Sequence, residues 1–135
     1  MSPPTLGARY LAACVRLGVV EWRAGMLSSY GERCREVDRW GITWWGERGY
    51  IVTDGAVDGE VPDLSDSATM GCALAVAREA GHAPGMFVRP TATGWTVMRG
   101  SGAGMGKLSD GPSEAEALVQ ALERLAAERA AGGTP

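Results

Sequence analysis

The sequence of 135 residues contains a single histidine, His82, and only three cysteines, Cys14, Cys34 and Cys72. One histidine excludes a metal site built from several histidines. An odd number of widely spaced cysteines does not indicate a disulfide framework, so we expect reduced thiols, with Cys14 and Cys72 inside apolar helix patterns. The composition therefore points to a protein without a cofactor.

Long apolar runs and a strong net charge are also missing. No apolar run reaches the length needed to cross a bilayer, and residues 1–5 hold two prolines but no charged segment ahead of an apolar one. We therefore expect a cytoplasmic protein with no membrane contact. The formal net charge of -3 is too small to predict a nucleic-acid partner from the overall field.

Common catalytic and ligand-binding motifs are absent or incomplete. There is no Gly-x-Ser-x-Gly nucleophile elbow. Residues 100–107 are glycine-rich and end in a lysine, but Ser101 and Leu108 stand where a phosphate-binding loop has glycine and a hydroxyl residue. The acidic residues 54–66 lack calcium-loop spacing, since Ala56 occupies the third position. We interpret the first segment as a mobile linker between strands and the second as a solvated connector.

Capping residues and apolar periodicity predict three helices. Thr5 can cap the first, which stops at Gly18. A central helix is expected over residues 66–80, and its long uncharged stretch suggests that other parts of the chain cover it on all sides. Ser113 and Glu116 form a capping box at the start of the last helix.

Alternating apolar residues and turn signals predict two hairpins between these helices. We interpret residues 19–22 as extended and residues 26–38 as a short hairpin around a turn at 28–31. The clearer strands are expected at residues 42–45, 50–53, 86–89 and 94–99, with a short edge strand at 107–108.

A chain of this length is expected to form one domain with one core. We predict a single α+β domain over residues 1–130 and a disordered tail over residues 131–135. In this domain an antiparallel sheet of two hairpins packs against the central apolar helix and the amphipathic C-terminal helix.

The first hairpin carries the predicted binding surface. A four-residue connection pairs Trp45 with Tyr50 and places both on the face opposite Trp44. If only one face packs on the core, the aromatic pair faces solvent; the alternative is that helices cover both faces. The acidic connector follows directly. The predicted binding residues are Trp45, Arg48, Tyr50, Asp54, Asp58 and Glu60.

A thiol site is the alternative chemistry. Cys34 and His82 could form a nucleophile and base pair if the fold brought them together in a cleft. We expect His82 to be a solvated residue after the central helix, near the helix C-terminus.

Several phrases of the sequence resemble small uncharacterised proteins encoded in phage and prophage genomes. They are WRAGML at 22–27, DLSDSATMGC at 63–72 followed by REA at 78–80, GWTV at 94–97 and SEAEALVQALE at 113–123. The resemblance implies an origin and supplies no catalytic residue. From residue 66 the predicted element order also resembles the double-stranded-RNA-binding domain, but that family places lysines where Ser113, Glu114 and Glu116 stand here, so direct nucleic-acid binding is disfavoured.

The leading hypothesis is a non-enzymatic phage-type accessory protein that binds a host protein, as a counter-defence, anti-CRISPR-like inhibitor would in the host cytoplasm. The acidic connector would suit a host protein with a basic nucleic-acid-binding surface. The alternatives are a small thiol or hydrolase-type enzyme using Cys34 and His82, and a minor virion or assembly component. The sequence does not decide the oligomeric state.

Overall fold

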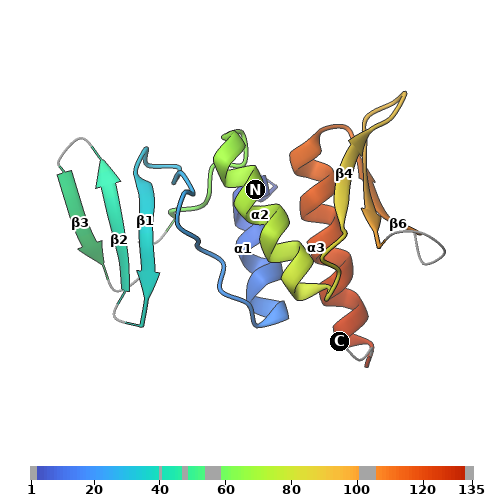
Figure 1. Cartoon of the computed structure of the whole chain (residues 1–135), viewed down its shortest axis with the longest axis horizontal. Coiled ribbons are helices and arrows are strands. Elements are labelled where there is room, and N and C mark those ends of the chain that lie inside the picture. Colours follow the sequence, from blue (N-terminus) through green and yellow to red (C-terminus); the bar gives the residue numbers. More distant parts are fainter. Residues whose placement is uncertain (1–2, 40, 47–48, 54–58, 101–105, 133–135) are drawn as a thin grey trace.

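A computed structural model describes residues 3–39, 41–46, 49–53, 59–100 and 106–132. In chain order the elements are α1 (Leu6–Leu17), β1 (Arg33–Asp38), β2 (Gly41–Gly46), β3 (Gly49–Thr53), α2 (Ser67–Ala80), β4 (Phe87–Pro90), β5 (Trp95–Arg99), β6 (Gly106–Gly111) and α3 (Glu114–Ala130). Figure 1 shows the helices between a sheet of β1, β2 and β3 and a second sheet that begins with β4.

The three helices begin at the residues that the sequence predicts. The side chains of Thr5, Asp66 and Ser113 each accept a hydrogen bond from the backbone N–H three residues later. Capping satisfies a donor that has no partner within the helix. Of the predicted capping box, the hydrogen bond from the Glu116 N–H to the Ser113 hydroxyl is present. The Glu116 carboxylate pairs instead with Arg9 of α1.

All three helices run in the same direction, so their C-terminal ends also meet. Arg129, near the end of α3, donates hydrogen bonds to the carbonyl oxygens of Leu17 and Ala80, the last residues of α1 and α2. A guanidinium suits this position because the last carbonyls of a helix carry partial negative charge. Figure 1 shows the shared direction of the three helices.

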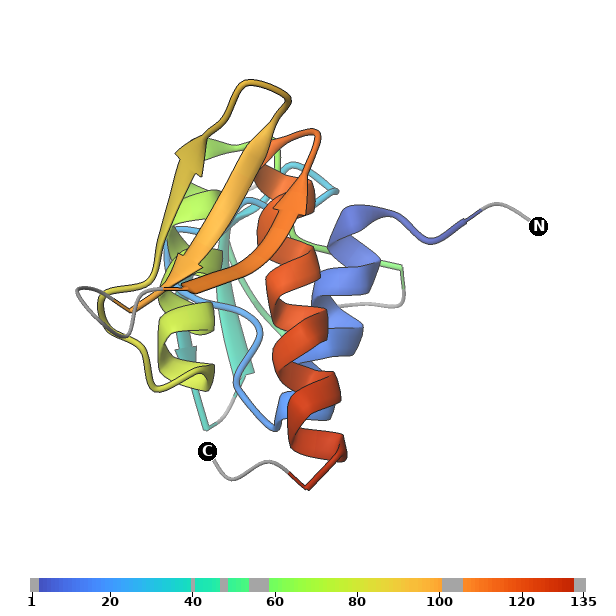
Figure 2. The ribbon, with the colours of Figure 1, turned by 90° about the vertical axis from the view of Figure 1, so that its right-hand side faces the viewer.

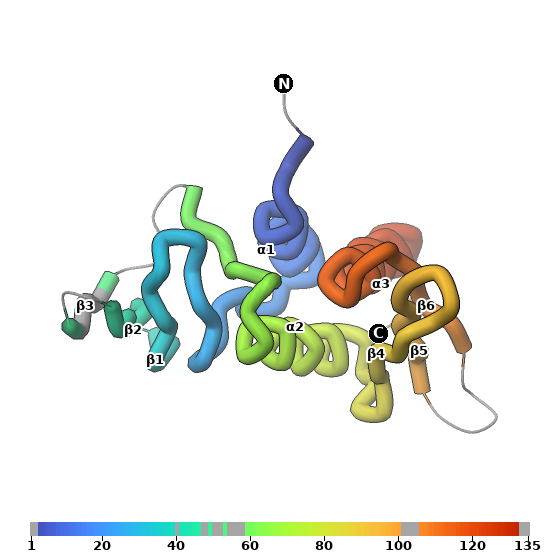
Figure 3. Tube along the Cα trace, turned by 90° about the horizontal axis from the view of Figure 1, so that it is seen from above, coloured from blue at the N-terminus to red at the C-terminus, as the bar shows by residue number. Residues whose placement is uncertain are grey.

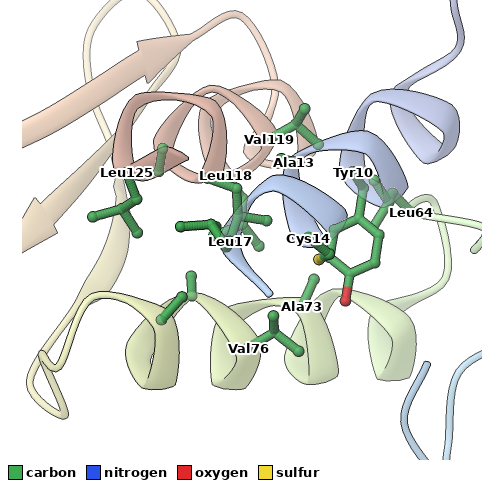
Figure 4. Close-up of a cluster of buried hydrophobic side chains, with 14 of the residues drawn as sticks. Tyr10, Ala13, Cys14, Leu17, Leu64, Ala73, Val76, Leu118, Val119 and Leu125 are labelled. Atoms are coloured by element: carbon green, nitrogen blue, oxygen red, sulfur yellow. The ribbon is translucent and has the colours of Figure 1, made fainter. Parts of the chain in front are cut away.

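The helices enclose the core of the protein, which Figure 4 shows in close-up. Tyr10 and Cys14 of α1 point toward Ala73 and Val76 of α2, and Leu118 of α3 lies beside them. The tyrosine is fully buried, and its hydroxyl donates a 2.6 Å hydrogen bond to the carbonyl oxygen of Glu21. Close packing of small and large side chains fixes the distances between the helices.

Strands β4, β5 and β6 form an antiparallel sheet that packs on α3 (Figure 2). Val97 and Leu108 are buried between the sheet and the helix, and the Ser109 hydroxyl donates a 2.6 Å hydrogen bond to the Ala117 carbonyl. The predicted second hairpin is confirmed, and the short edge strand extends over Gly106–Gly111. Of the predicted linker at 100–107, residues 101–105 lie outside the described residues.

The first hairpin belongs to a separate sheet, in the order β1-β2-β3, at the other end of the molecule (Figures 1 and 3). Its inner face is buried through Ile42 and Trp44, and the Trp44 ring packs edge-on against Trp22 with ring centroids 5.0 Å apart. The α+β class is therefore confirmed, whereas the two hairpins lie in two sheets and not in one. Aromatic edge-to-face packing attaches the first sheet to the body.

Several local predictions are also corrected. Residues 19–22 belong to no strand. The short hairpin predicted over residues 26–38 is present in part: Leu27 bridges Arg33 across the turn, and the Cys34 N–H donates a 2.7 Å hydrogen bond to the Met26 carbonyl oxygen. The rest of β1 pairs with β2. Helix α2 is not covered on all sides, because Ala68, Gly71 and Ala75 are exposed. Of the tail predicted at 131–135, only residues 131 and 132 are described, and they form a turn.

Candidate functional site

The structure describes part of the hairpin surface that the sequence predicts to bind a partner. The register pairs Trp45 with Tyr50 as expected, and Trp45 is 52% exposed. The side chain of Tyr50, like Arg48, Asp54 and Asp58, lies outside the described residues. These four therefore stay predictions.

Glu60 does not belong to a solvated acidic surface. Its side chain is buried, with 4% of the residue exposed. It begins a segment, here called the strap (residues 60–66), that crosses the molecule before α2. The strap is held by backbone hydrogen bonds, from Ser29 N to Val61 O at 2.7 Å and from Asp63 N to Leu27 O at 2.8 Å. The C-terminal end of the acidic connector is therefore an ordered part of the fold, held by backbone hydrogen bonds.

The alternative thiol site does not form. Cys34 is buried on β1, while His82 is exposed beyond the C-terminal end of α2, which lies away from β1 in both Figure 1 and Figure 3. Burial raises the pKa of the Cys34 thiol to about 11, which disfavours the thiolate needed for nucleophilic attack. His82 follows the helix end as predicted, in a left-handed conformation with φ of 50°.

A groove lies where the N-terminal ends of α1, α2 and α3 meet, beside the strap. Its volume is about 970 Å³. The residues that line it are Thr5, Leu6, Gly7, Ser29, Val61, Pro62, Asp63, Leu64, Ser65, Ser67, Met70, Gly71, Leu74, Ser113, Glu114 and Ala115. Each helix contributes its cap or its first turn, so the groove is a direct consequence of the shared helix direction.

The floor and rim of the groove differ in chemistry. Leu6, Met70 and Leu74 are half-buried hydrophobic side chains at its wall. The hydroxyl-bearing residues of the lining are exposed, and together with two acids, Asp63 and Glu114, they are here called the rim. No lysine or arginine lines the groove. Met70 and Leu74 belong to the uncharged stretch that the sequence predicts to be covered, but at this end of α2 they remain partly accessible.

A glycine brings the strap close to α1 beside the groove. A Cβ atom on Gly7 would lie 2.6 Å from the Pro62 carbonyl oxygen and 2.7 Å from a methyl group of Val61. Both distances are well below van der Waals contact, so only glycine allows the strap to cross the first turn of α1 here. The width of the groove depends on this crossing.

An ion pair fixes the start of α2. The Arg33 guanidinium of β1 donates hydrogen bonds of 2.9 and 3.3 Å to the Asp66 carboxylate. The same carboxylate accepts from the backbone N–H and hydroxyl of Thr69. Arg33 and these Thr69 bonds lower the pKa of Asp66 to about 2. The groove wall is thereby joined to the first sheet.

A smaller hollow of about 660 Å³ lies on the other sheet, lined in part by Arg89, Trp95 and Lys107. Three of its polar side chains pair with one another. Lys107 donates a 2.7 Å hydrogen bond to Asp110, which accepts a 2.6 Å bond from the Thr96 hydroxyl. The carboxylate of Asp110 is therefore already engaged by two neighbouring side chains.

The groove is the feature that sequence reasoning missed. The three capping residues were recognisable, but nothing local says that the helices they start lie side by side. Among the described residues, no group of three or more His, Cys, Asp or Glu side chains is placed to hold a metal ion. Nor does any helix in that part of the chain have the length and apolarity to cross a membrane.

Comparison with known proteins adds no relative. The chain matches no protein-family model, and neither the curated proteins nor the solved structures contain one with significant similarity to it.

Proposed function

We propose that this protein is a non-enzymatic binding module that takes a segment of another protein into the groove at the N-terminal ends of its helices. The observation that carries the proposal is the lining of that groove, an apolar wall with a rim of hydroxyl groups and two carboxylates. Apolar centres with polar rims are typical of surfaces that bind proteins.

The charges of the rim indicate what the bound segment contains. Asp63 and Glu114 are negative, and no basic residue lines the groove. An apolar segment flanked by lysine or arginine would match both the wall and the rim. This agrees with the expectation of a basic partner, although the acids involved differ from those predicted on the connector.

The partner class follows the sequence resemblance. We propose a host protein with a basic surface, whose activity the module blocks in the manner of a counter-defence inhibitor. The support is the match in charge between such a surface and the groove rim. A phage origin rests on the quoted sequence phrases.

The exposed Trp45 offers a second candidate surface on the first sheet. A half-exposed tryptophan is a frequent anchor of protein interfaces. Because Trp45 lies on β2 and the groove lies among the helices, variants at the two places separate the two surfaces.

A selection with a peptide-display library tests the proposal. Peptides enriched on the wild-type protein are expected to combine apolar residues with lysine or arginine. Met70→Lys places a charge in the groove wall and should abolish the enrichment, while Val15→Lys is the matched control on an exposed position (71%) outside the groove.

Two further variants define the outcome. Glu114→Lys should shift the selected peptides toward acidic residues if the rim sets the charge preference. Trp45→Ala should leave the selection unchanged. Loss of enrichment with Trp45→Ala, and not with Met70→Lys, would move the binding site to the first sheet and refute the groove.

A further inference from the structure

Among the described residues, two sheets are present, and their edge strands are β1, β3, β4 and β6. An edge strand presents unpaired backbone N–H and C=O groups, which can pair with a strand of another molecule. Proteins discourage such pairing with charged residues, prolines, bulges or a covering segment.

Three of the four edges carry such protection. Strand β1 contains four charged residues and a bulge, and Leu27 bridges to its first residue. Strand β4 ends in Arg89 and Pro90. Strand β6 carries Lys107 and Asp110, with an irregular register against β5.

Within the part of the chain that the structure describes, strand β3 carries none of these features. Its sequence, GYIVT, has no charge and no proline, and three of its residues are β-branched. Its register against β2 is regular over all five residues, without a bulge. Within the described residues no strand pairs with its other edge. An uncharged, regular edge rich in β-branched residues is the type that pairs with further strands.

We propose that two copies of this chain pair through β3, antiparallel, to form a continuous six-stranded sheet. An antiparallel pair of identical strands is related by a two-fold axis, so one surface serves both partners. Because β3 is uncharged, two copies approach without electrostatic repulsion between the paired strands.

The dimer leaves the groove accessible. Strand β3 is the outermost strand of the first sheet and lies at the end of the molecule farthest from α3 (Figures 1 and 3). Pairing there keeps the N-terminal ends of the helices free in both copies. The proposal therefore stands independently of what the groove binds.

Sedimentation equilibrium of the full chain is the test. The wild-type protein should dimerise, and backbone amides of β3 should exchange with solvent more slowly as protein concentration rises. Val52→Lys adds a charge to the edge and should weaken the dimer by about tenfold or more. Thr43→Lys is the control, because it adds the same charge opposite Val52 on the central strand β2.

A proline variant tests the backbone contribution directly. Successive backbone N–H groups of a strand point to opposite edges, so one of residues 51 and 52 directs its N–H toward β2 and the other directs it toward the free edge. Of the variants Ile51→Pro and Val52→Pro, the one at the outward-facing position loses only the N–H at the free edge and keeps the hydrogen bonds to β2. Near-UV circular dichroism identifies the folded variant, which should be monomeric. A wild-type protein that stays monomeric up to about 1 mM, or a Val52→Lys variant that dimerises as strongly as Thr43→Lys, would overturn the proposal.

Discussion

Replacement of Asp66 separates its two contributions to stability. The carboxylate caps α2 and also pairs with Arg33. Asp66→Ala removes both interactions, while Asp66→Asn keeps a side chain that caps well and removes the charge. If both contacts matter, the two variants should differ in their free energy of unfolding.

The structure sets the expected magnitudes. Loss of an N-cap lowers the free energy of unfolding by about 1 kcal/mol. The fall in the pKa of Asp66 from 3.8 to about 2 corresponds to about 2.4 kcal/mol in favour of the charged form. Because the Arg33 side chain is 41% exposed, solvent screening reduces the ion pair to about 1 kcal/mol. We therefore expect a loss of about 1 kcal/mol for Asn and about 2 kcal/mol for Ala.

The pH dependence provides a second, independent readout. The pKa of Asp66 is lower in the folded protein than in the unfolded chain, so its charge stabilises the fold fully above pH 3.8 and progressively less as the pH falls toward 2. The stability difference between wild type and Asp66→Asn should be constant near neutral pH and shrink below pH 4. Urea unfolding followed by tryptophan fluorescence measures both quantities.

Two results would refute this reasoning. If Asp66→Asn and Asp66→Ala lower the free energy of unfolding equally, the cap contributes nothing. If the difference in the free energy of unfolding between wild type and Asp66→Asn does not change with pH, the ion pair contributes nothing. Arg33→Gln, alone and combined with Asp66→Asn, closes a double-mutant cycle whose coupling energy should be about 1 kcal/mol.

Three further predictions concern the core, the thiols and the strap. Tyr10→Phe leaves the partly buried Glu21 carbonyl without its donor and should lower the free energy of unfolding by about 1–2 kcal/mol in urea titrations, whereas an unchanged value would mean that water replaces the hydroxyl. Alkylation at pH 8 should modify Cys72 before Cys14 and Cys34, because Cys72 is partly exposed, whereas the other two thiols are buried and their burial raises their pKa to about 11. Preferential alkylation of Cys34, detected by mass spectrometry, would instead favour thiol chemistry. Gly7→Ala forces the strap away from α1 and should destabilise the protein by about 1–3 kcal/mol, and a thermally unchanged variant would contradict the close crossing.

Local signals in the sequence were sufficient to place the helices and the hairpins. The side chains of Thr5, Asp66 and Ser113 cap helices in the structure because an N-cap depends only on residues within one turn. The pairing of Trp45 with Tyr50 followed from the length of the connection between two strands.

Relations between distant segments could not be predicted in the same way. Strand periodicity indicates which face of a strand is buried but not which hairpins share a sheet, so the sequence predicts one sheet where the structure has two. Glu60 lies in an acidic run of the sequence, yet its side chain is buried at the start of the strap. The groove requires three helix starts to meet, which depends on packing across the whole core.

The proposed groove is tested most directly by nuclear magnetic resonance titration with a peptide enriched in the display selection. Backbone resonances of groove residues such as Leu6, Met70 and Ala115 should shift upon titration, and those of Thr43 and Trp45 on the first sheet should not. Met70→Lys should abolish the shifts and Val15→Lys should preserve them. Shifts confined to the first sheet, or binding that survives Met70→Lys unchanged, would contradict the proposed function.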